Sequence, residues 1–375
     1  MTWLRYGAVL VALVLTACGG AGGPEATPTL THTPTHASTP TPGVPAAPPA
    51  TEIELPAGFT AFVVADGFVQ PTSVGLGPDG SIYVSQRGGP VFRLIDADGD
   101  GVYEERVAYT ADISGIHGFA FAPDGSLYVS NVGRVTVVRD TNGDGVGDAV
   151  EDVIADLPHD RHENNGITFG PDGKLYITNG STCNDCVEVH EYSATILQAN
   201  PDGSDLRVYA RGLRNSYDLI FDPEGRLWAT DNGADPPCNT IDELNLVEDG
   251  GDYGWPYGPG CDSLRSGAPP AADLGFNTAS TGIDYYDGEQ FPIEFRGDLF
   301  ITLWGSLEYA PVPGGRILVR AVIDETAEGP RVVTVEDFGT GFQRPIDVIV
   351  DRDGALLTLD FGSGLLYRIV YTGGG

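Results

Sequence analysis

The segment that decides the fold is ITFGPDGKLYIT, residues 167–178, in which an apolar stretch is followed by a Pro-Asp-Gly turn and a second apolar stretch. An Asp-Gly turn between two such stretches is typical of a β-hairpin. The same pattern recurs at 74–85, 119–130, 219–230, 348–359 and, in a weaker form, 295–302. The chain therefore repeats one hairpin unit six times.

The spacing of these hairpins predicts the architecture. Their turn glycines lie 45, 48, 52, 72 and 57 residues apart, at Gly80, Gly125, Gly173, Gly225, Gly297 and Gly354. A period of about 45–50 residues with four strands in each unit is typical of propeller blades. We therefore predict an all-β fold, a six-bladed β-propeller with four-stranded blades, over residues 53–372.

The same pattern predicts two details of the ring. The last strand, Leu365–Tyr371, has no strand after it, so an N-terminal strand at Thr60–Ala65 is expected to complete the last blade. The long fourth interval predicts a loop excursion within residues 231–294, and excursions of this size are usually functional.

The composition excludes one class of partner. The chain has 375 residues, with 53 Asp+Glu against 20 Lys+Arg and a formal net charge of −33. A surface this acidic repels nucleic acid and anionic membrane surfaces, so nucleic-acid binding is excluded. The 52 Gly and 28 Pro favour short strands joined by turns over long helices.

The first 52 residues are predicted to be a signal peptide followed by a tether. Residues 1–17 have the apolar core of a signal peptide, and the small residues before Cys18 resemble a bacterial lipobox, in which Cys18 would be lipidated. An ordinary signal peptide with an incidental cysteine is the alternative. Residues 18–52 are rich in Thr and Pro and are predicted to be a disordered tether. We expect an exported protein in the bacterial cell envelope, facing outside the cytoplasm and touching the membrane only through its lipid anchor.

Four further cysteines follow, at Cys183, Cys186, Cys238 and Cys261. Export permits disulfides, and four cysteines allow three pairings. The local pairing, Cys183–Cys186 with Cys238–Cys261, is our prediction, and a four-cysteine zinc site is the alternative.

Two predicted hairpins have turns with the oxygen spacing of a calcium loop, at positions 1, 3, 5 and 9 around a glycine. The first has Asp96, Asp98, Asp100 and Glu104, and the second has Asp140, Asn142, Asp144 and Asp148. We predict a structural Ca²⁺ ion in each. A solvated acidic turn is the alternative.

Residues just before the innermost strand of each blade are expected to converge at one end of the central channel. Counting back 8 to 11 residues from the turn glycines finds Gln70, His117, His162, Arg214, Asn215 and Arg344. Such a set can supply a base, hydrogen-bond donors and positive charge for an anionic ligand. The alternatives are arginines that neutralise neighbouring carboxylates and, for His117, a packed core histidine.

Several of these residues lie in motifs that resemble the PQQ-dependent glucose/sorbosone dehydrogenase family. The matching segments are 161–166, 170–176, 210–215, 227–233, 242–245 and 250–256. The Cys183-x-x-Cys186 motif and residues 344–348 resemble its sorbosone dehydrogenase branch most closely. The resemblance extends over residues 55–371.

The resemblance implies a quinoprotein site. His162 would be the general base toward a sugar hydroxyl, a task that suits the ordinary histidine pKa near 6.5. Arg214 would meet the cofactor oxygen that becomes negative on reduction, and Asn215 and Arg344 would help to hold PQQ. Calcium would be held by the carbonyls of Gly233 and Ala234, and a neighbouring calcium by Glu243 and Tyr253.

The chain departs from the family at positions that carry polar or basic residues there. Ile346, Gly305 and the pair Leu303-Trp304 stand where relatives have basic residues, and Ile113 falls near a glutamine position. PQQ carries three carboxylates, and the basic residues that would pair with them are absent at these positions.

The predicted function is the oxidation of an aldose, or a related sugar aldehyde or hemiacetal, to a lactone or acid, with an external electron acceptor. One alternative is a calcium-dependent lactonase-type propeller hydrolase. The presence of His162, Arg214 and Arg344 at the channel argues against the buried dication of that class. The other alternative is a tethered propeller without catalytic activity that binds carbohydrates or proteins.

Overall fold

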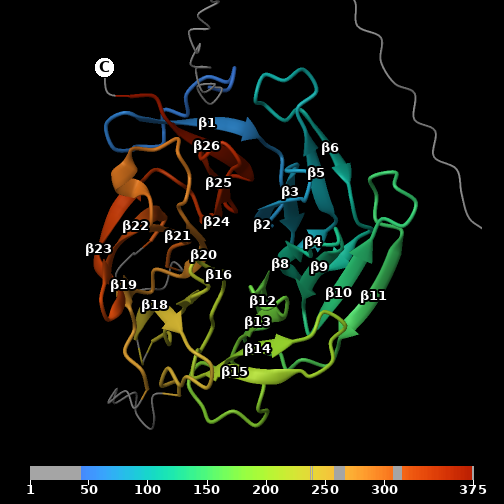
Figure 1. Ribbon diagram of the computed structural model, residues 1–375, viewed down its shortest axis with the longest axis vertical. Helices are drawn as coiled ribbons and strands as arrows, with labels where there is room; N and C mark the ends of the chain where they lie inside the picture. The colour runs from blue at the N-terminus through green and yellow to red at the C-terminus, as the bar shows by residue number, and fades with distance from the viewer. Residues whose placement is uncertain (1–43, 237, 239, 257–266, 307–314, 374–375) are drawn as a thin grey trace, which may run out of the picture. The chain divides into compact units, whose positions relative to one another are not determined.

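The computed structural model describes residues 44–236, 238, 240–256, 267–306 and 315–373. Almost all regular structure in this part of the chain is β-strand, as predicted, and the strands form six four-stranded antiparallel sheets and one two-stranded sheet. Figure 1 shows the sheets arranged as blades around a common axis. Among the described residues, no helix is long and apolar enough to cross a membrane.

The first three blades follow one another along the chain. Blade one contains β2 (Pro71–Leu76), β3 (Ile82–Gln86), β5 (Val91–Ile95) and β6 (Glu105–Ala108). Blade two contains β8 (Ile116–Phe121), β9 (Leu127–Asn131), β10 (Arg134–Arg139) and β11 (Ala149–Ile154). Blade three contains β12 (Asn164–Phe169), β13 (Leu175–Asn179), β14 (Thr195–Ala199) and β15 (Arg207–Arg211). A small ribbon of β4 (Gly88–Gly89) and β7 (Ile113–Ser114) joins blades one and two.

The remaining blades complete the ring. Blade four contains β16 (Leu219–Phe221), β17 (Leu227–Asp231), β18 (Ile241–Val247) and β19 (Ala272–Phe276). Blade five contains β20 (Ser280–Tyr285), β21 (Leu299–Leu303), β22 (Ile317–Thr326) and β23 (Gly329–Gly339), and a short 3-10 helix, η2 (Ile293–Phe295), precedes β21. Blade six contains β24 (Pro345–Val350), β25 (Leu356–Asp360), β26 (Leu365–Tyr371) and β1 (Phe59–Ala65). The predicted excursion is the segment 248–271 between β18 and β19, part of which lies outside the described residues.

An N-terminal strand closes the last blade, as predicted. β1 pairs antiparallel with β26, with Phe59 opposite Tyr371. The chain joins the propeller before residue 53, because Pro49 forms a β-bridge with Phe62 and Ala50 is buried. Residues 1–43, which contain the predicted signal peptide, Cys18 and most of the tether, lie outside the described residues.

The inner strands β2, β8, β12, β16, β20 and β24 contact one another in this order and close the ring. Three carboxylates link consecutive blades here, because each accepts a backbone N–H from the next blade. Asp218 accepts from Ile283 (3.2 Å), Asp284 from Val350 (2.7 Å) and Asp347 from Val74 (2.8 Å). Burial raises the pKa of Asp284 and that of Asp347 to about 7.

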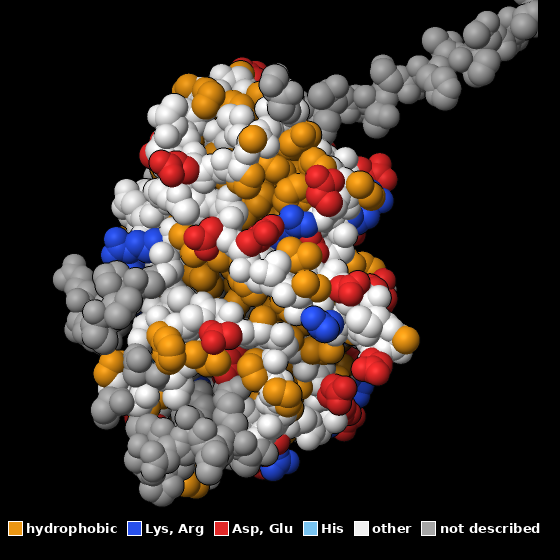
Figure 2. All heavy atoms as spheres, turned by 90° about the vertical axis from the view of Figure 1, so that its left-hand side faces the viewer, with side chains coloured by type: hydrophobic (Ala, Val, Ile, Leu, Met, Phe, Trp, Pro, Cys, Tyr) orange, Lys and Arg blue, Asp and Glu red, His pale blue; other side chains and the backbone are white. Residues whose placement is uncertain are grey.

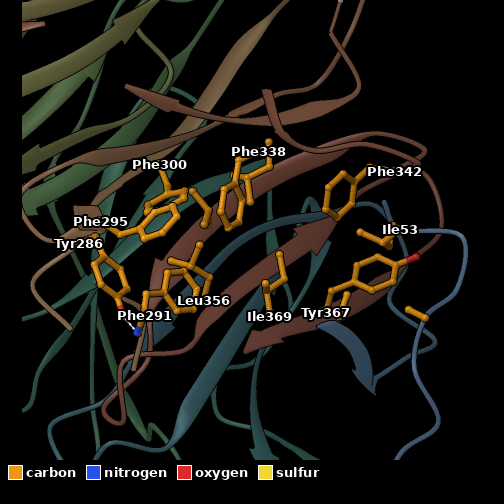
Figure 3. Close-up of a cluster of buried hydrophobic side chains, with 14 residues drawn as sticks. Ile53, Tyr286, Phe291, Phe295, Phe300, Phe338, Phe342, Leu356, Tyr367 and Ile369 are labelled. Atoms are coloured by element: carbon orange, nitrogen blue, oxygen red, sulfur yellow. Dashed lines mark hydrogen bonds between the residues drawn. The ribbon is translucent and has the colours of Figure 1, made fainter. Parts of the chain in front are cut away.

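Apolar side chains fill the space between neighbouring blades. Figure 3 shows one such cluster between blades five and six, with rings from Tyr286, Phe291, Phe300 and Phe338. The Tyr286 and Phe291 rings are stacked with centroids 4.6 Å apart, and the Phe300 and Phe338 rings meet edge-on at 4.9 Å. Other acidic residues lie on the surface, and Figure 2 shows them spread over one face of the molecule.

Candidate functional site

A cavity of about 410 Å³ lies where all six blades meet, within the size range of small-molecule sites. It is lined by the beginnings of inner strands and the ends of second strands, which lie at the same end of the ring because the strands are antiparallel. The lining residues are Thr72, Arg87, His117, His162, Arg214, Asn215, Tyr217, Asn232, Gly233, Asp235, Asp242, Asn277, Ala279, Thr281, Trp304, Gly305, Ser306, Ile346 and Phe361.

His162 lies just before β12 and borders this cavity. Its Nδ1 is 3.1 Å from the Ser181 carbonyl oxygen and 2.9 Å from the Ser181 hydroxyl oxygen. A carbonyl oxygen can only accept a hydrogen bond, so Nδ1 carries the ring hydrogen and Nε2 keeps a lone pair. His162 therefore has the tautomer in which Nε2 can accept a proton.

The electrostatic environment of His162 corrects the expectation of an ordinary pKa. Burial, with the positive charges of Arg214 and Arg161, lowers the pKa of His162 to about 3. A nearby carboxylate, Asp235, opposes this shift only in part. The imidazole is thus neutral throughout the neutral pH range, whereas a pKa near 6.5 was expected from the residue type alone.

Gly180 permits the close approach of two site residues. A Cβ atom on Gly180 would lie 2.5 Å from Cβ of His162 and 3.0 Å from Oδ1 of Asn215. Contacts below 3.0 Å are essentially never seen for real Cβ atoms, so only glycine fits here. Gly180 follows β13, and its N–H donates to the Glu163 carbonyl at 3.0 Å.

Arg214 is buried, and protein atoms engage its guanidinium fully. Nε donates to the Asn184 carbonyl (2.9 Å), and Nη2 to Oδ1 of Asn184 (2.8 Å) and to Asp235 (3.2 Å). Nη1 donates to the carbonyls of Asn232 (3.1 Å) and Gly233 (2.8 Å). The guanidinium therefore borders the cavity and holds the Gly233 carbonyl, one of the two carbonyls that the family resemblance gives to calcium.

Asn215 lines the cavity, and Arg344 lies behind its wall. Oδ1 of Asn215 accepts a hydrogen bond from Asn165 at 3.0 Å. The Arg344 guanidinium lies 3.9 Å over the Trp304 ring and donates to the carbonyls of Gly305 (3.1 Å) and Ser306 (3.3 Å). Trp304, Gly305 and Ser306 line the cavity, so Arg344 supports its wall.

Two buried aspartates hold the backbone of the site. Asp231 accepts the N–H groups of Arg214 (3.0 Å) and Asn215 (2.7 Å), and burial raises its pKa to about 7. Asp242 accepts the N–H of Gly233 at 2.8 Å, and burial raises its pKa to about 6. These carboxylates fix the positions of the residues around Arg214 and Gly233.

The structure places the other predicted metal ligands of this region outside the cavity lining. Glu243 is buried on β18 opposite Asp231, and Tyr253 is buried with its hydroxyl donating to the Leu246 carbonyl at 2.8 Å. Ala234 is also buried, next to Gly233 in the chain. Calcium binding by these residues stays a prediction.

His117, Glu163 and Arg87 form a hydrogen-bonded network at the cavity, of which the sequence pattern predicted only His117. Nε2 of His117 is 2.9 Å from Oε1 of Glu163, which also accepts from Arg87 at 3.0 Å. The hydrogen bond from His117 is the main cause of the lowered pKa of Glu163. Four of the six residues found by counting backward line the cavity, whereas Gln70 and Arg344 are not among the lining residues.

A second count, forward from the turn glycines, identifies more of the residues that line the cavity. Four lining residues stand seven positions after a turn glycine, at the end of a second strand: Arg87, Asn232, Trp304 and Phe361. Gly180 occupies the same position in blade three. Counting forward as well as backward from each turn would therefore have identified both sets.

The two acidic loops connect β5 to β6 and β10 to β11. In the first, oxygens of Asp96, Asp98 and Glu104 lie within 4.8 Å of one another. Asp96 also accepts backbone N–H groups of the loop, including that of Gly99 at 2.7 Å, and Asp100 accepts that of Val102 at 2.9 Å.

The second loop is closed by its own hydrogen bonds. Asp140 accepts the N–H of Gly143, Asn142 that of Asp144, and Asp144 that of Val146. Asp148 accepts both the N–H and the hydroxyl of Thr141. Calcium in either loop stays a prediction.

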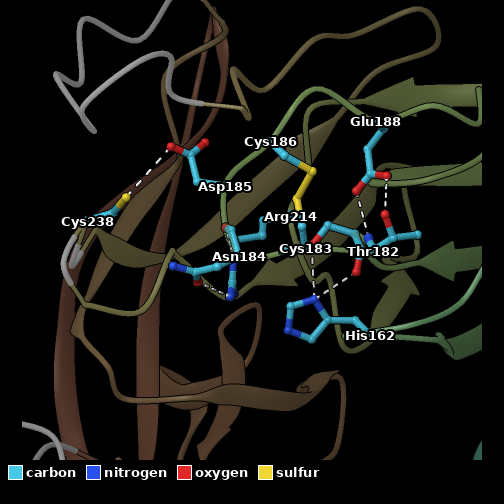
Figure 4. Close-up of a disulfide and its surroundings, with 10 residues drawn as sticks. His162, Thr182, Cys183, Asn184, Asp185, Cys186, Glu188, Arg214 and Cys238 are labelled. Atoms are coloured by element: carbon cyan, nitrogen blue, oxygen red, sulfur yellow. Dashed lines mark hydrogen bonds between the residues drawn. A yellow bond between two sulfur atoms is a disulfide. The ribbon is translucent and has the colours of Figure 1, made fainter.

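The Cys183–Cys186 disulfide is present, with an S–S distance of 2.02 Å (Figure 4). The bond uses two of the thiols that a four-cysteine zinc site would require. Cys261 lies outside the described residues, so its pairing with Cys238 stays a prediction.

The chain is similar to parts of curated proteins. An uncharacterized protein of Borreliella burgdorferi is 28% identical over 198 residues, which cover 48% of this chain and 52% of that protein. Quinoprotein glucose dehydrogenase B of Acinetobacter calcoaceticus is 35% identical over 80 residues, 18% of this chain and 16% of that protein. The chain thus matches about half, or less, of the length of these curated relatives.

A solved structure and a family model extend the comparison. The holo form of the pyranose dehydrogenase PQQ domain from Coprinopsis cinerea has a TM-score of 0.71 and 17% identity, covering 87% of this chain and 99% of that one. At this identity the likeness shows the fold. The family model described as a domain of unknown function, DUF7133, matches residues 85–303, more than half of the chain. The chain therefore belongs to the DUF7133 family.

Proposed function

We propose that this protein is an exported quinoprotein that oxidises an aldose, or a related sugar aldehyde or hemiacetal, to the lactone or acid. The observation that carries the proposal is His162, a neutral imidazole with its Nε2 lone pair available, at a cavity shared by all six blades. The similarity to quinoprotein glucose dehydrogenase B and to the fold of a pyranose dehydrogenase PQQ domain supports it. The cysteine motif and residues 344–348 favour the sorbosone dehydrogenase branch.

The cavity fits a flat, polar cofactor such as PQQ. Its volume suits a small molecule, and the rings of Trp304 and Phe361, with centroids 5.9 Å apart and planes inclined at 65°, give it an aromatic wall. Arg344 lies against Trp304, and Arg87, whose side chain is 51% exposed, borders the cavity. Arg87, which is paired with Glu163 at 3.0 Å, is a further cation at the cavity. When bound, PQQ would supply a hydride acceptor.

Residues of this chain would then perform the proton transfer, the charge stabilisation and the binding of the cofactor. Nε2 of His162 would take the proton from the substrate hydroxyl, as a general base. The buried charge of Arg214 would stabilise negative charge that develops beside it. Asn215 would help to hold the cofactor, whereas Arg344, which is not among the lining residues, would act by supporting the wall through Trp304.

Calcium would bind at the Gly233 and Ala234 carbonyls, with a second ion near Glu243 and Tyr253. The Gly233 carbonyl now accepts from Arg214, so metal binding there requires this carbonyl to be shared with, or released by, the guanidinium. The cavity carboxylates of Asp235 and Asp242 are engaged by protein donors, which does not favour the central dication of a lactonase.

The cellular setting is proposed from the sequence. The predicted signal peptide, Cys18 and the Thr/Pro-rich tether predicted over residues 18–52, whose end packs on the propeller at Pro49 and Ala50, support an exported protein that is lipid-anchored in the bacterial envelope. An external electron acceptor would receive the electrons from the reduced cofactor.

The experiment that tests the proposal adds PQQ and Ca²⁺ to purified protein and measures the reduction of a dye acceptor with a panel of aldoses. Dye reduction that depends on PQQ, sugar and His162 supports the proposal. Hydrolysis of sugar lactones without PQQ would show that the protein is a lactonase and would reject the proposed oxidation. The absence of both activities, together with the absence of PQQ binding, would reject an enzymatic quinoprotein.

A further inference from the structure

The loop after β13 connects the disulfide to His162 through one serine. The hydroxyl of Ser181, a residue with no exposed surface, donates to the Cys183 carbonyl at 2.8 Å. The same hydroxyl oxygen lies 2.9 Å from Nδ1 of His162. A serine hydroxyl has a single hydrogen, and here that hydrogen is directed to Cys183. Ser181 can therefore only accept from the imidazole.

The backbone of Ser181 reinforces this direction. Its carbonyl oxygen accepts from the His162 backbone N–H at 3.2 Å and from Nδ1 at 3.1 Å. Both oxygens of Ser181 thus favour a hydrogen on Nδ1 and a lone pair on Nε2. The Ser181 hydroxyl acts only as an acceptor from Nδ1 while its own hydrogen is donated to a fixed acceptor, the Cys183 carbonyl.

The disulfide fixes that acceptor. It closes the short loop from Cys183 to Cys186, and two hydrogen bonds of 2.6 Å from Thr182 to the Glu188 carboxylate hold the segment that leads into this loop. Within the same loop, Asn184 accepts two hydrogen bonds from Arg214. Figure 4 shows His162 and Arg214 held by this loop.

We propose that Ser181 is a positioning residue for His162, and that the Cys183–Cys186 bond keeps the Ser181 hydroxyl directed toward Cys183 and thereby keeps the lone pair of His162 on Nε2. If the loop opens, the hydroxyl can turn and donate to Nδ1. A hydroxyl that donates to Nδ1 competes with the Ser181 carbonyl and raises the share of rings that carry their hydrogen on Nε2, where no lone pair is then available. The loss of general-base activity at Nε2 rests on the proposed function, but the inference about the tautomer of His162 does not.

The tautomer can be measured directly, without cofactor or substrate. The chain has six histidines, so ¹⁵N-histidine labelling gives six ring systems, and a His162→Gln variant identifies the one of interest. Ring ¹⁵N shifts distinguish a protonated from an unprotonated nitrogen. In the wild type with its disulfide intact, we expect a protonated Nδ1 and an unprotonated Nε2 at neutral pH.

Three variants test the role of the loop. In Cys183→Ala/Cys186→Ala and in Ser181→Ala, the share of the Nε2-protonated tautomer should rise. Ser193→Ala is the matched control: Ser193 is also buried in blade three, but its hydroxyl has no hydrogen-bond partner among the described residues. This control should keep the wild-type tautomer.

Activity supplies the second readout. Loss of one hydrogen bond predicts a fall in turnover of about three- to tenfold in Ser181→Ala, with KM nearly unchanged, and Ser181→Thr should restore most of the rate. A wild type with Nε2 protonated, or an unchanged tautomer in both Ser181→Ala and the double cysteine variant, overturns the proposal. If the tautomer behaves as expected but no sugar oxidation is found, the proposed function fails and the positioning inference stands.

Discussion

Replacement of Gly180 by alanine introduces a methyl group where His162 and Asn215 leave no room. The new Cβ would lie 2.5 Å from Cβ of His162, whereas ordinary van der Waals contacts begin at 3.4 Å. The backbone carbonyl of Glu163, at 3.1 Å, blocks movement in another direction. Because the Glu163 carbonyl also accepts from the Gly180 N–H, the strand end cannot shift without losing that bond.

The size of the effect follows from this overlap. Relief of the contact requires His162 to move by about 1 Å, and a misplacement of that size in a catalytic group costs on the order of 10²-fold in rate. Overpacking of a dense interior also destabilises by about 1–3 kcal/mol. We therefore expect Gly180→Ala to lose about 10²-fold in turnover, while the melting temperature falls by only a few degrees.

The assay is PQQ-dependent dye reduction with the best aldose, together with thermal unfolding. Gly88→Ala is the matched control, because a Cβ on Gly88 meets no atom within 4 Å. That variant should retain wild-type turnover and stability. Near-normal turnover in Gly180→Ala would refute the placement of His162 in the catalytic site.

Three further predictions follow from the charges of the molecule. His162→Ala should lower turnover by about 10²–10⁴-fold and leave PQQ binding and stability nearly intact, and wild-type kcat/KM should show no step from His162 between about pH 5 and 8, because burial lowers its pKa to about 3. A step near pH 6.5 that disappears in the variant would contradict this. Burial raises the pKa of Asp284 and Asp347 to about 7, so the native state binds their protons more tightly than the unfolded chain does, and the melting temperature should fall as pH rises from about 4 to 8. Asp284→Asn with Asp347→Asn should flatten that profile, and an unchanged slope would count against it. EDTA should lower the melting temperature if the loop of Asp96 and Glu104 binds Ca²⁺, since a ligand of the native state stabilises it, and metal-free dialysed protein with the same melting curve would exclude this site.

The sequence predicted the propeller because its signals are local and repeated. An Asp-Gly or similar turn between two apolar stretches specifies a hairpin by itself, and six such turns, 45 to 72 residues apart, determine the number of blades. The closing strand was found by the absence of a partner for the last strand, and it pairs with β26 as predicted. The first disulfide, between Cys183 and Cys186, was predicted from short spacing and is present.

The candidate site was predicted in part, for a geometrical reason. Counting back from the turns found His162, Arg214 and Asn215 because inner strands all begin at the same end of the ring. It missed Arg87 and Phe361, which lie at the ends of second strands on that same end.

The electrostatics could not be read from the pattern. The pKa of His162 depends on its burial and on the charge of Arg214, which comes from the next blade. The hydrogen bonds of Arg214 depend on the irregular loop around Asn184, which has no periodicity to follow. Such features arise only when the complete ring has formed.

In the proposed function, the cavity holds a quinone beside His162, and His162 removes the proton of a sugar hydroxyl. Anaerobic addition of aldose to protein loaded with PQQ and Ca²⁺, followed by quinone absorbance, tests it most directly. The account predicts rapid bleaching of the bound quinone in the wild type, and retention of the same bound spectrum without bleaching in His162→Gln. Failure of the wild type to bind PQQ, or equal bleaching in the His162→Gln variant, would contradict it.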